Sequence, residues 1–180
     1  MTVTTLQAEY RRRAGISHDI QRQMPVLYAW ARYATHIIEL GVRSGNSTAA
    51  FLAGLEHGGG ELWSVDITDP DVPAAWRDLP FWHLHTGDDT SPEAIKFCPD
   101  EADVLFIDTS HAYGHTMTEL EVYVPKLRPG GVALLHDTCA GPYGSWPDVP
   151  RALNDWTRQA GLEWYNHPWW HGLGVIEIPQ

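Results

Sequence analysis

The stretch "IIELGVRSGNST", residues 37–48, decides the fold expected for this chain. A short apolar run ends in Glu39, and a loop with Gly41 and Gly45 leads into small polar residues, 46–48, of the kind that cap helices. Glycines let a backbone approach a ligand closely. The loop has neither the Gly-Lys-Ser/Thr ending of a P-loop nor the dinucleotide glycine spacing, so we expect it to hold a ligand edge with hydroxyl and ammonium groups.

Outward from this stretch, short β-rich apolar runs alternate with segments of helical character. We expect strands near residues 35–40, 61–66, 82–86, 103–108 and 131–137, and helices near 46–56, 91–97 and 115–127. This alternation predicts an α/β fold with a Rossmann-like, doubly wound and mostly parallel sheet. After "RPGG", a helix near 149–160 and the runs "LEWYNHP" and "LGVIEIPQ" predict a C-terminal antiparallel strand pair.

Length and composition predict a single domain over residues 1–180, because 43% hydrophobic and 19% charged residues is an ordinary globular balance. Residues 1–30 are expected to be helical, with an interruption at Pro25, and to cover the site as a flap or pack on a sheet edge. Residues 35–138 would form the ligand-binding core, and residues 149–180 would add the closing helix and strands.

Charge limits the class of partner. A net charge of −11, with 23 acidic and 12 basic residues, argues against binding to nucleic acid. The basic cluster Arg11-Arg12-Arg13 is expected to be a solvated helix face. Cys98 and Cys139 form no metal-type pair and are expected to be reduced, and we see neither a signal-peptide pattern nor a membrane span. We therefore expect a cytoplasmic protein with a small-molecule partner, and a homo-oligomer is compatible with the sequence.

Acidic residues end or directly follow the five predicted parallel strands. The carboxyl ends of such strands meet at one rim, where ligands bind, so these acids should gather there: Glu39, Asp66, Asp88, Asp108 and Asp137. The runs "DVLFID" and "GVALLHD" are almost continuously apolar, as expected for strands buried on both faces. Asp66, at the end of the second strand, is placed to accept hydrogen bonds from both hydroxyls of a ribose.

The last two of these acids predict a metal site. Asp108 and Asp137 follow neighbouring central strands, so their oxygens can converge on one divalent cation, or else they cap the loops after the strands. His136 would be a softer ligand than a carboxylate and would favour manganese, iron, nickel or zinc over magnesium. Alternatively, His136 is hydrogen-bonded within the core.

Four motifs, "IIELGVRSGNST", "LWSVDI", "HTGDD" and "DVLFIDTSHAYGHTMTELEVYVPKLRPGGVALLHDT", together resemble class I S-adenosylmethionine-dependent methyltransferases over residues 35–138. The resemblance is closest to the group of macrolide-sugar O-methyltransferases and cephalosporin-hydroxylase-like proteins. It implies methyl transfer from S-adenosylmethionine to a hydroxyl of a sugar-like or catechol-like metabolite, assisted by a divalent metal, magnesium or manganese. The alternative is a member of the fold that does not methylate, and instead binds the cofactor or runs another metal-dependent reaction.

The resemblance also implies roles for individual residues. The residues expected to contact the cofactor are Glu39, Gly41 and Ser47 at its methionine end, Asp66 at the ribose, Asp88 at the adenine, and Asp108. The residues expected to bind the metal are Asp108, His136 and Asp137.

A general base is expected at His111, three residues after Asp108, the position at which the resembled sugar enzymes place one. The acceptor hydroxyl must lose its proton during methyl transfer, and an imidazole can accept it at neutral pH. His115 could share this role or cap the following helix. Trp146 is placed to touch the acceptor, whereas the tail "EWYNHPWWHGLG", which contains His171, is expected to pack around a sheet edge rather than stack on a sugar.

Overall fold

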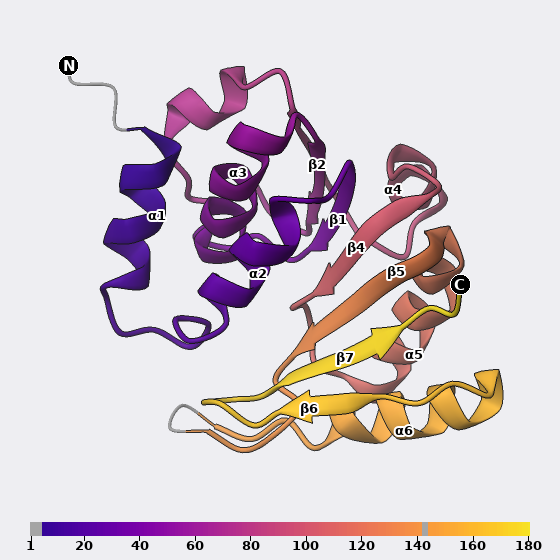
Figure 1. The fold of residues 1–180 in the computed structure, drawn as a ribbon. Helices are drawn as coiled ribbons and strands as arrows, with labels where there is room; N and C mark the ends of the chain where they lie inside the picture. Colours follow the sequence, from indigo (N-terminus) through magenta and orange to yellow (C-terminus); the bar gives the residue numbers. More distant parts are fainter. Residues whose placement is uncertain (1–4, 142–143) are drawn as a thin grey trace.

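Seven strands form one sheet in the order β3-β2-β1-β4-β5-β7-β6 in a computed structural model that describes residues 5–141 and 144–180 (Figure 1). Their bounds are β1 His36–Leu40, β2 Glu61–Asp66, β3 Trp82–Thr86, β4 Ala102–Ile107, β5 Leu127–His136, β6 Tyr165–His167 and β7 Leu173–Glu177. Strands β1 to β5 run parallel to one another, and β7 runs antiparallel between β5 and β6. The predicted mostly parallel sheet with a C-terminal antiparallel pair is confirmed.

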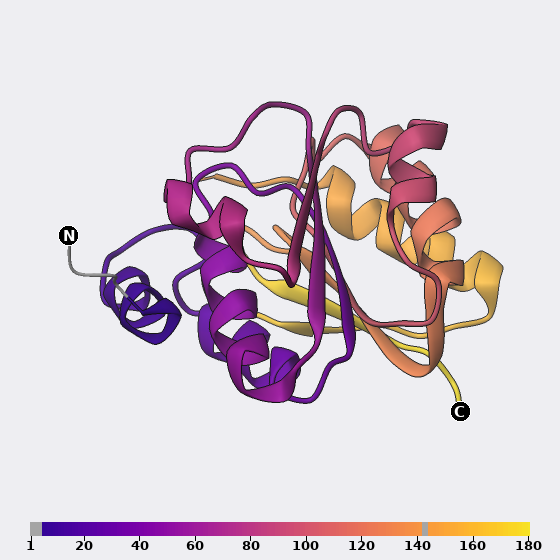
Figure 2. The same ribbon diagram turned by 90° about the horizontal axis from the view of Figure 1, so that it is seen from above.

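Helices cover both faces of the sheet, as the doubly wound prediction requires (Figure 2). Their bounds are α1 Leu6–Ala14, α2 Met24–Ala31, α3 Asn46–Gly58, α4 Pro92–Phe97, α5 Tyr113–Tyr123 and α6 Asp148–Ala160, with short 3-10 helices η1 Ala74–Asp78 and η2 Val124–Lys126. Helices α1 to α3 lie on one side and α4 to α6 on the other (Figures 1 and 2). In the described part of the chain, no helix combines the length and apolar character needed to cross a membrane.

Two proline positions differ from the sequence-based expectation. Pro25 does not interrupt a helix but lies in the first turn of α2, where its missing N–H costs no hydrogen bond. The helix predicted to run to residue 127 ends at Tyr123, because Pro125 cannot continue the α-helical ladder and a 3-10 turn follows.

Successive residues of the central strands point to opposite faces, so each strand contributes to two hydrophobic cores. Ile37 and Phe106 belong to the core under α2 and α3, where Phe106 meets Phe51 at a centroid distance of 5.7 Å. Ile38 and Leu105 belong to the core under α4, α5 and α6. The sheet is therefore rigidly held from both sides, and the loops at its carboxyl ends start from fixed positions.

The N-terminal helices pack mainly on α3 rather than on a sheet edge. Arg11 and Arg12 lie on the exposed face predicted for the basic cluster, but the prediction is wrong for Arg13. The Nη1 atom of Arg13 donates to the carbonyl oxygen of Ser44 at 2.6 Å and to Oδ1 of Asn46 at 3.0 Å. Helix α1 is thereby tied directly to the glycine loop.

The contact between α2 and α3 depends on Gly54. A Cβ at this position would lie 2.4 Å from the Cβ of Ala31 and 2.8 Å from the carbonyl oxygen of Tyr28. We predict that Gly54→Ala lowers the free energy of unfolding by about 1–3 kcal/mol, because the methyl group has no room. The matched control is Gly114→Ala in α5, where nothing lies within 4 Å of the added Cβ.

In the control, the helix preference of alanine should stabilise the protein by up to about 1 kcal/mol. Urea unfolding measured by circular dichroism gives both values. Equal effects of the two substitutions would show that the α2–α3 contact is not limited by the size of residue 54.

Candidate active site

The glycine loop begins where β1 and β4 separate, which is the topological switch point of the sheet. Gly41 has φ +90, and a Cβ there would lie 2.0 Å from the carbonyl oxygen of Asp108. Its N–H donates to the carbonyl oxygen of Val65 at 2.9 Å. Only glycine fits this position, and its fit brings the ends of β1, β2 and β4 together around one opening.

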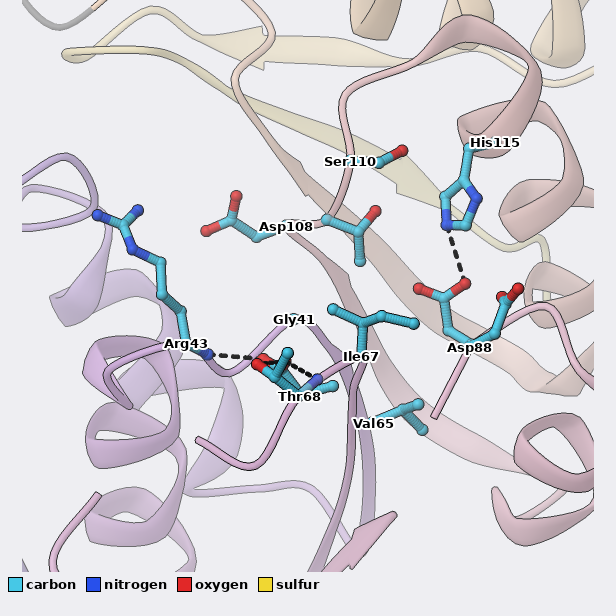
Figure 3. Close-up of a pocket in the computed structure, with 12 residues that line it drawn as sticks. Gly41, Arg43, Val65, Ile67, Thr68, Asp88, Asp108, Ser110 and His115 are labelled. Atoms are coloured by element: carbon cyan, nitrogen blue, oxygen red, sulfur yellow. Dashed lines mark hydrogen bonds and ion pairs between the residues drawn. The ribbon is translucent and has the colours of Figure 1, made fainter. Parts of the chain in front are cut away.

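This opening is a pocket of about 430 Å³, here named the glycine-loop pocket. Four of the predicted cofactor residues line it, namely Gly41, Asp66, Asp88 and Asp108. Figure 3 shows Arg43 and His115 at opposite sides of the pocket, with Asp108 between them. The volume lies within the range of small-molecule sites in proteins.

Asp66 holds the loop in this structure. Its Oδ2 accepts hydrogen bonds from the backbone N–H groups of Val42 at 2.8 Å and Arg43 at 2.7 Å. Its Oδ1 accepts from the N–H and the hydroxyl of Thr68 at 2.9 and 3.2 Å. Both carboxylate oxygens therefore already have two donors, and the predicted contact of Asp66 with a ribose stays a prediction.

Glu39 and Ser47 are buried and are not among the residues that line the glycine-loop pocket. Glu39 is fully buried, and its carboxylate accepts from the hydroxyls of Thr48 at 2.9 Å and Ser64 at 2.6 Å. Burial raises the pKa of Glu39 to about 7, although hydrogen bonds from Ser47, Ser64 and Thr48 oppose the rise. The predicted cofactor contacts of Glu39 and Ser47 therefore also stay predictions.

The same contacts correct the predicted start of α3. Residues 46–48 do not cap this helix, because its N-cap is Gly45 and no side chain bonds the first backbone N–H groups. The hydroxyls of Ser47 and Thr48 turn inward to Glu39 instead. A buried acid below the loop thus takes the hydroxyl groups that the sequence pattern had assigned to capping.

A second pocket of about 440 Å³, here named the histidine pocket, lies beside the first. The loop between α1 and α2 contributes Ser17, His18 and Asp19 to its wall. Arg43 and Asp108 line both pockets. If each pocket held a ligand, the two ligands would therefore come together beside Asp108.

Acidic and imidazole side chains meet at the floor of the histidine pocket. We name Asp108, His111, His136, Asp137 and His171 the Asp108–Asp137 cluster. The Oδ2 of Asp137 lies 2.7 Å from Nε2 of His111 and 3.1 Å from Nδ1 of His136, and its Oδ1 lies 3.0 Å from Nδ1 of His171. The Oδ1 of Asp108 lies 3.3 Å from Nδ1 of His136 and 3.5 Å from Nε2 of His111.

The donor atoms of this cluster fit a divalent metal. Despite the short distances, Nε2 of His111, both ring nitrogens of His136 and Oδ1 of Asp137 are buried without an aligned hydrogen bond. Ligand atoms of Asp108, His111 and Asp137 all lie within 4.8 Å of one another. Carboxylate oxygens and imidazole nitrogens are ligands of manganese, iron and zinc, so a cation would satisfy several of the atoms that lack partners, although it could bind only one of the two nitrogens of His136.

Backbone conformation marks the same place. His111 has φ 57 and Asp137 has φ 60, in the left-handed region that residues other than glycine rarely adopt. Such strain persists where the surrounding structure enforces it, often at functional sites. Both residues line the histidine pocket.

The carboxylates control the charge of the histidines. Burial alone would lower the pKa of His111, but the nearby carboxylates of Asp108 and Asp137 outweigh it and raise the pKa to about 9. For His136, burial is likewise outweighed by the carboxylates of Asp108 and Asp137, which lie close to its ring, and the pKa rises to about 10. In the metal-free cluster, both imidazoles are therefore protonated on both ring nitrogens, and so positively charged, at neutral pH.

The sequence did not identify His171 as part of this cluster. It is 1% exposed, as expected for packing, but it also contacts Asp137. The pairing of β7 with β5 is what could have identified His171. Its register places Leu173 opposite His136 and so brings the residues that precede Leu173 to the end of β5. Trp146, in contrast, lies where expected, with its ring stacked on His111 at a centroid distance of 4.6 Å.

His115 does not cap the following helix, and its share in the base role stays a prediction. The N-cap of α5 is Ala112, so His115 does not cap this helix. Its Nε2 lies 2.9 Å from Oδ1 of Asp89, on the far side of the glycine-loop pocket from Arg43 (Figure 3). The structure therefore brings His111, and not His115, to Asp108 and Asp137.

Comparison with known proteins agrees with this geometry. The model of a family described as "Methyltransferase domain" matches residues 38–138. The uncharacterized protein y4gI of Sinorhizobium fredii is 27% identical over 158 residues, which cover 78% of this chain. The chain spans only 17% of the length of that relative.

Solved structures of methyltransferases share the fold. The Podospora anserina methyltransferase PaMTH1, bound to S-adenosylhomocysteine, has a TM-score of 0.69 and 19% identity, with 97% of this chain and 88% of that chain covered. The TDP-rhamnose 3'-O-methyltransferase CalS11 of calicheamicin biosynthesis has a TM-score of 0.66 and 17% identity, with 89% of this chain and 80% of that chain covered. The mycinamycin-pathway methyltransferase MycE, in complex with magnesium and S-adenosylhomocysteine, has a TM-score of 0.64 and 18% identity, with 98% of this chain and 54% of that chain covered.

The raised histidine pKa values predict how stability depends on pH. In the presence of a chelator, the stabilisation from protonated His111 and His136 is complete below their ordinary pKa of 6.5 and is lost as pH rises through about 9 to 10. The melting temperature of the parent should therefore fall over this window more than that of His136→Gln, measured by differential scanning fluorimetry. Identical pH profiles of the two proteins would contradict the charge assignment.

Proposed function

The chain belongs to the methyltransferase-domain family, which methylates with S-adenosylmethionine, and on this premise we propose that it methylates a hydroxyl oxygen of a small metabolite with the help of a divalent metal. The observation that carries the proposal is the position of Asp108. This residue lines both pockets and belongs to the acid–imidazole cluster. A methyl donor in one pocket and a hydroxyl acceptor in the other would meet beside it.

In this proposal, S-adenosylmethionine occupies the glycine-loop pocket and the acceptor occupies the histidine pocket. The S-adenosylhomocysteine bound to PaMTH1 and to MycE supports the first assignment. The second pocket combines the aromatic ring of Trp146 with polar groups, including Asp19 and Asn46. An aromatic face beside hydrogen-bonding groups suits a sugar-like acceptor, and the sugar enzyme CalS11 shares the fold. A catechol-like acceptor is the alternative.

Asp108, Asp137 and His136 would hold the metal, and His111 would act on the proton. When bound, the metal supplies positive charge that lowers the pKa of the acceptor hydroxyl. As the methyl carbon forms its bond to the acceptor oxygen, its bond to the cofactor sulfur breaks. The hydroxyl proton passes to Nε2 of His111, so the transfer leaves a methyl ether and S-adenosylhomocysteine.

His111 can accept a proton only when it is neutral. Its contacts with Asp108 and Asp137 raise its pKa. A metal bound to these carboxylates would neutralise their charge, and burial would then lower the pKa of His111 again. Trp146, stacked on its ring, fixes the plane of the imidazole. The two carboxylates would thus set both the metal position and the protonation state of the base.

We predict that turnover requires a divalent metal. Chelation should abolish methyl transfer while S-adenosylhomocysteine still binds, as measured by isothermal titration calorimetry, because we propose that the cofactor binds in the glycine-loop pocket and the metal at the histidine pocket. Asp108→Asn or Asp137→Asn should raise the metal concentration needed for half-maximal turnover. His136→Ala should shift metal preference towards magnesium, because one nitrogen ligand is lost. Full turnover after exhaustive chelation would refute the metal-assisted mechanism.

We predict a large loss of turnover in His111→Ala. The rate constant should fall roughly 100-fold to 10,000-fold, the usual range for a lost general base, with little change in cofactor or metal affinity. The matched control is His83→Ala, because His83 also contacts a carboxylate, Glu61 at 2.7 Å, but lies on β3 outside both pockets. Near-parental turnover of His111→Ala would remove the base assignment, and weakened metal binding would make His111 a ligand.

A further inference from the structure

A second group of titratable side chains borders the glycine-loop pocket. Asp89 follows β3, whereas His115 and Glu119 lie one turn apart on α5. One ligand atom from each residue lies within 4.8 Å of the others. His115 and Asp89 also line the pocket, and Figure 3 shows His115 at its wall. None of these residues takes part in the chemistry proposed above.

Two carboxylate oxygens in this group are buried without hydrogen-bond donors. Glu119 is fully buried, and its Oε1 accepts from the hydroxyl of Thr109 at 2.6 Å, but its Oε2 has no hydrogen-bond partner. The residue Asp89 is 8% exposed, and its Oδ1 also lacks a hydrogen bond although Nε2 of His115 is 2.9 Å away. That contact is therefore close but not aligned as an N–H···O bond.

Unpaired buried acceptors are unfavourable, and unpaired buried charge is more so. Among the described residues, the only basic side chain that forms an ion pair with either Asp89 or Glu119 is His115. One imidazole cannot balance two carboxylates. The group therefore calls for one more positive charge where the side chains of Asp89, His115 and Glu119 meet.

We propose that Asp89, His115 and Glu119 form a second divalent-cation site, separate from the Asp108–Asp137 cluster. One imidazole nitrogen with two carboxylate oxygens is a donor set for manganese, iron or zinc, and it is less suited to magnesium. A cation at this site lies in the wall of the glycine-loop pocket. It would therefore influence the ligand bound there without belonging to the proposed methyl-transfer centre.

A shared proton is the competing occupant. Burial and the neighbouring carboxylate both raise the pKa of Glu119, and burial raises that of Asp89, so one carboxyl could hold a proton between them. The two occupants differ in one measurable respect. If a shared proton occupies the group instead of a metal ion, a variant that lacks the metal ligands of the Asp108–Asp137 cluster should bind no metal.

Counting bound Mn²⁺ tests the proposal. The full chain is titrated with Mn²⁺ alone, and the loss of the six-line electron paramagnetic resonance signal gives the bound ions. We expect two ions per chain in the parent and one in the Asp108→Asn, Asp137→Asn double variant. The Asp89→Asn, His115→Gln double variant should also bind one. The His83→Gln control, which alters a half-exposed histidine–carboxylate pair, should keep two.

The outcomes separate this site from the proposed function. The second site would be overturned if the parent binds a single ion that Asp89→Asn, His115→Gln still binds, or if that variant retains two ions. If the Asp108→Asn, Asp137→Asn variant keeps both ions, the metal-assisted mechanism fails while the second site stands. Near-ultraviolet circular dichroism of each variant checks folding, and Glu119→Gln, which keeps an acceptor for Thr109, provides an independent variant of the same site.

Discussion

The close approach of Gly41 to Asp108 is the contact on which the candidate site depends. A side chain at residue 41 would meet the carbonyl oxygen of Asp108 at 2.0 Å, so a larger residue would separate the glycine loop from the end of β4. Asp108 lines both pockets, and its carboxylate belongs to the acid–imidazole cluster. The width of the boundary between the pockets is therefore set by the absence of one Cβ atom.

Two buried acids hold the loop around this contact. Asp66 accepts the N–H groups of Val42 and Arg43, and Glu39 accepts the hydroxyls at the start of α3. Orienting these groups before a ligand binds reduces the ordering that binding must accomplish. The acids that sequence reasoning assigned to the ligand thus first organise the protein, and Arg13 adds a tie from α1 to the same loop.

The sequence predicted the sheet because parallel strands buried on both faces are nearly continuous apolar runs. It also predicted the meeting of Asp108 with Asp137, because both follow neighbouring strands whose ends share one rim. It could not predict His171 or Arg13, whose partners depend on how a distant loop and a separate helix return to the site. Nor could it distinguish hydroxyls that cap α3 from hydroxyls that bond Glu39, since both uses require the same residues at the same positions.

The two acid–imidazole groups differ in how their charge can be balanced. The Asp108–Asp137 cluster has two carboxylates and three imidazoles, so protonated histidines can neutralise it, and a metal must compete with those protons. Among the residues that the structure describes, Asp89 and Glu119 share only His115, so protonating that imidazole leaves one negative charge buried. The metal affinity of the Asp108–Asp137 cluster should therefore fall steeply as the pH is lowered. The second group requires either a cation or a protonated carboxyl at every pH at which both acids would otherwise ionise.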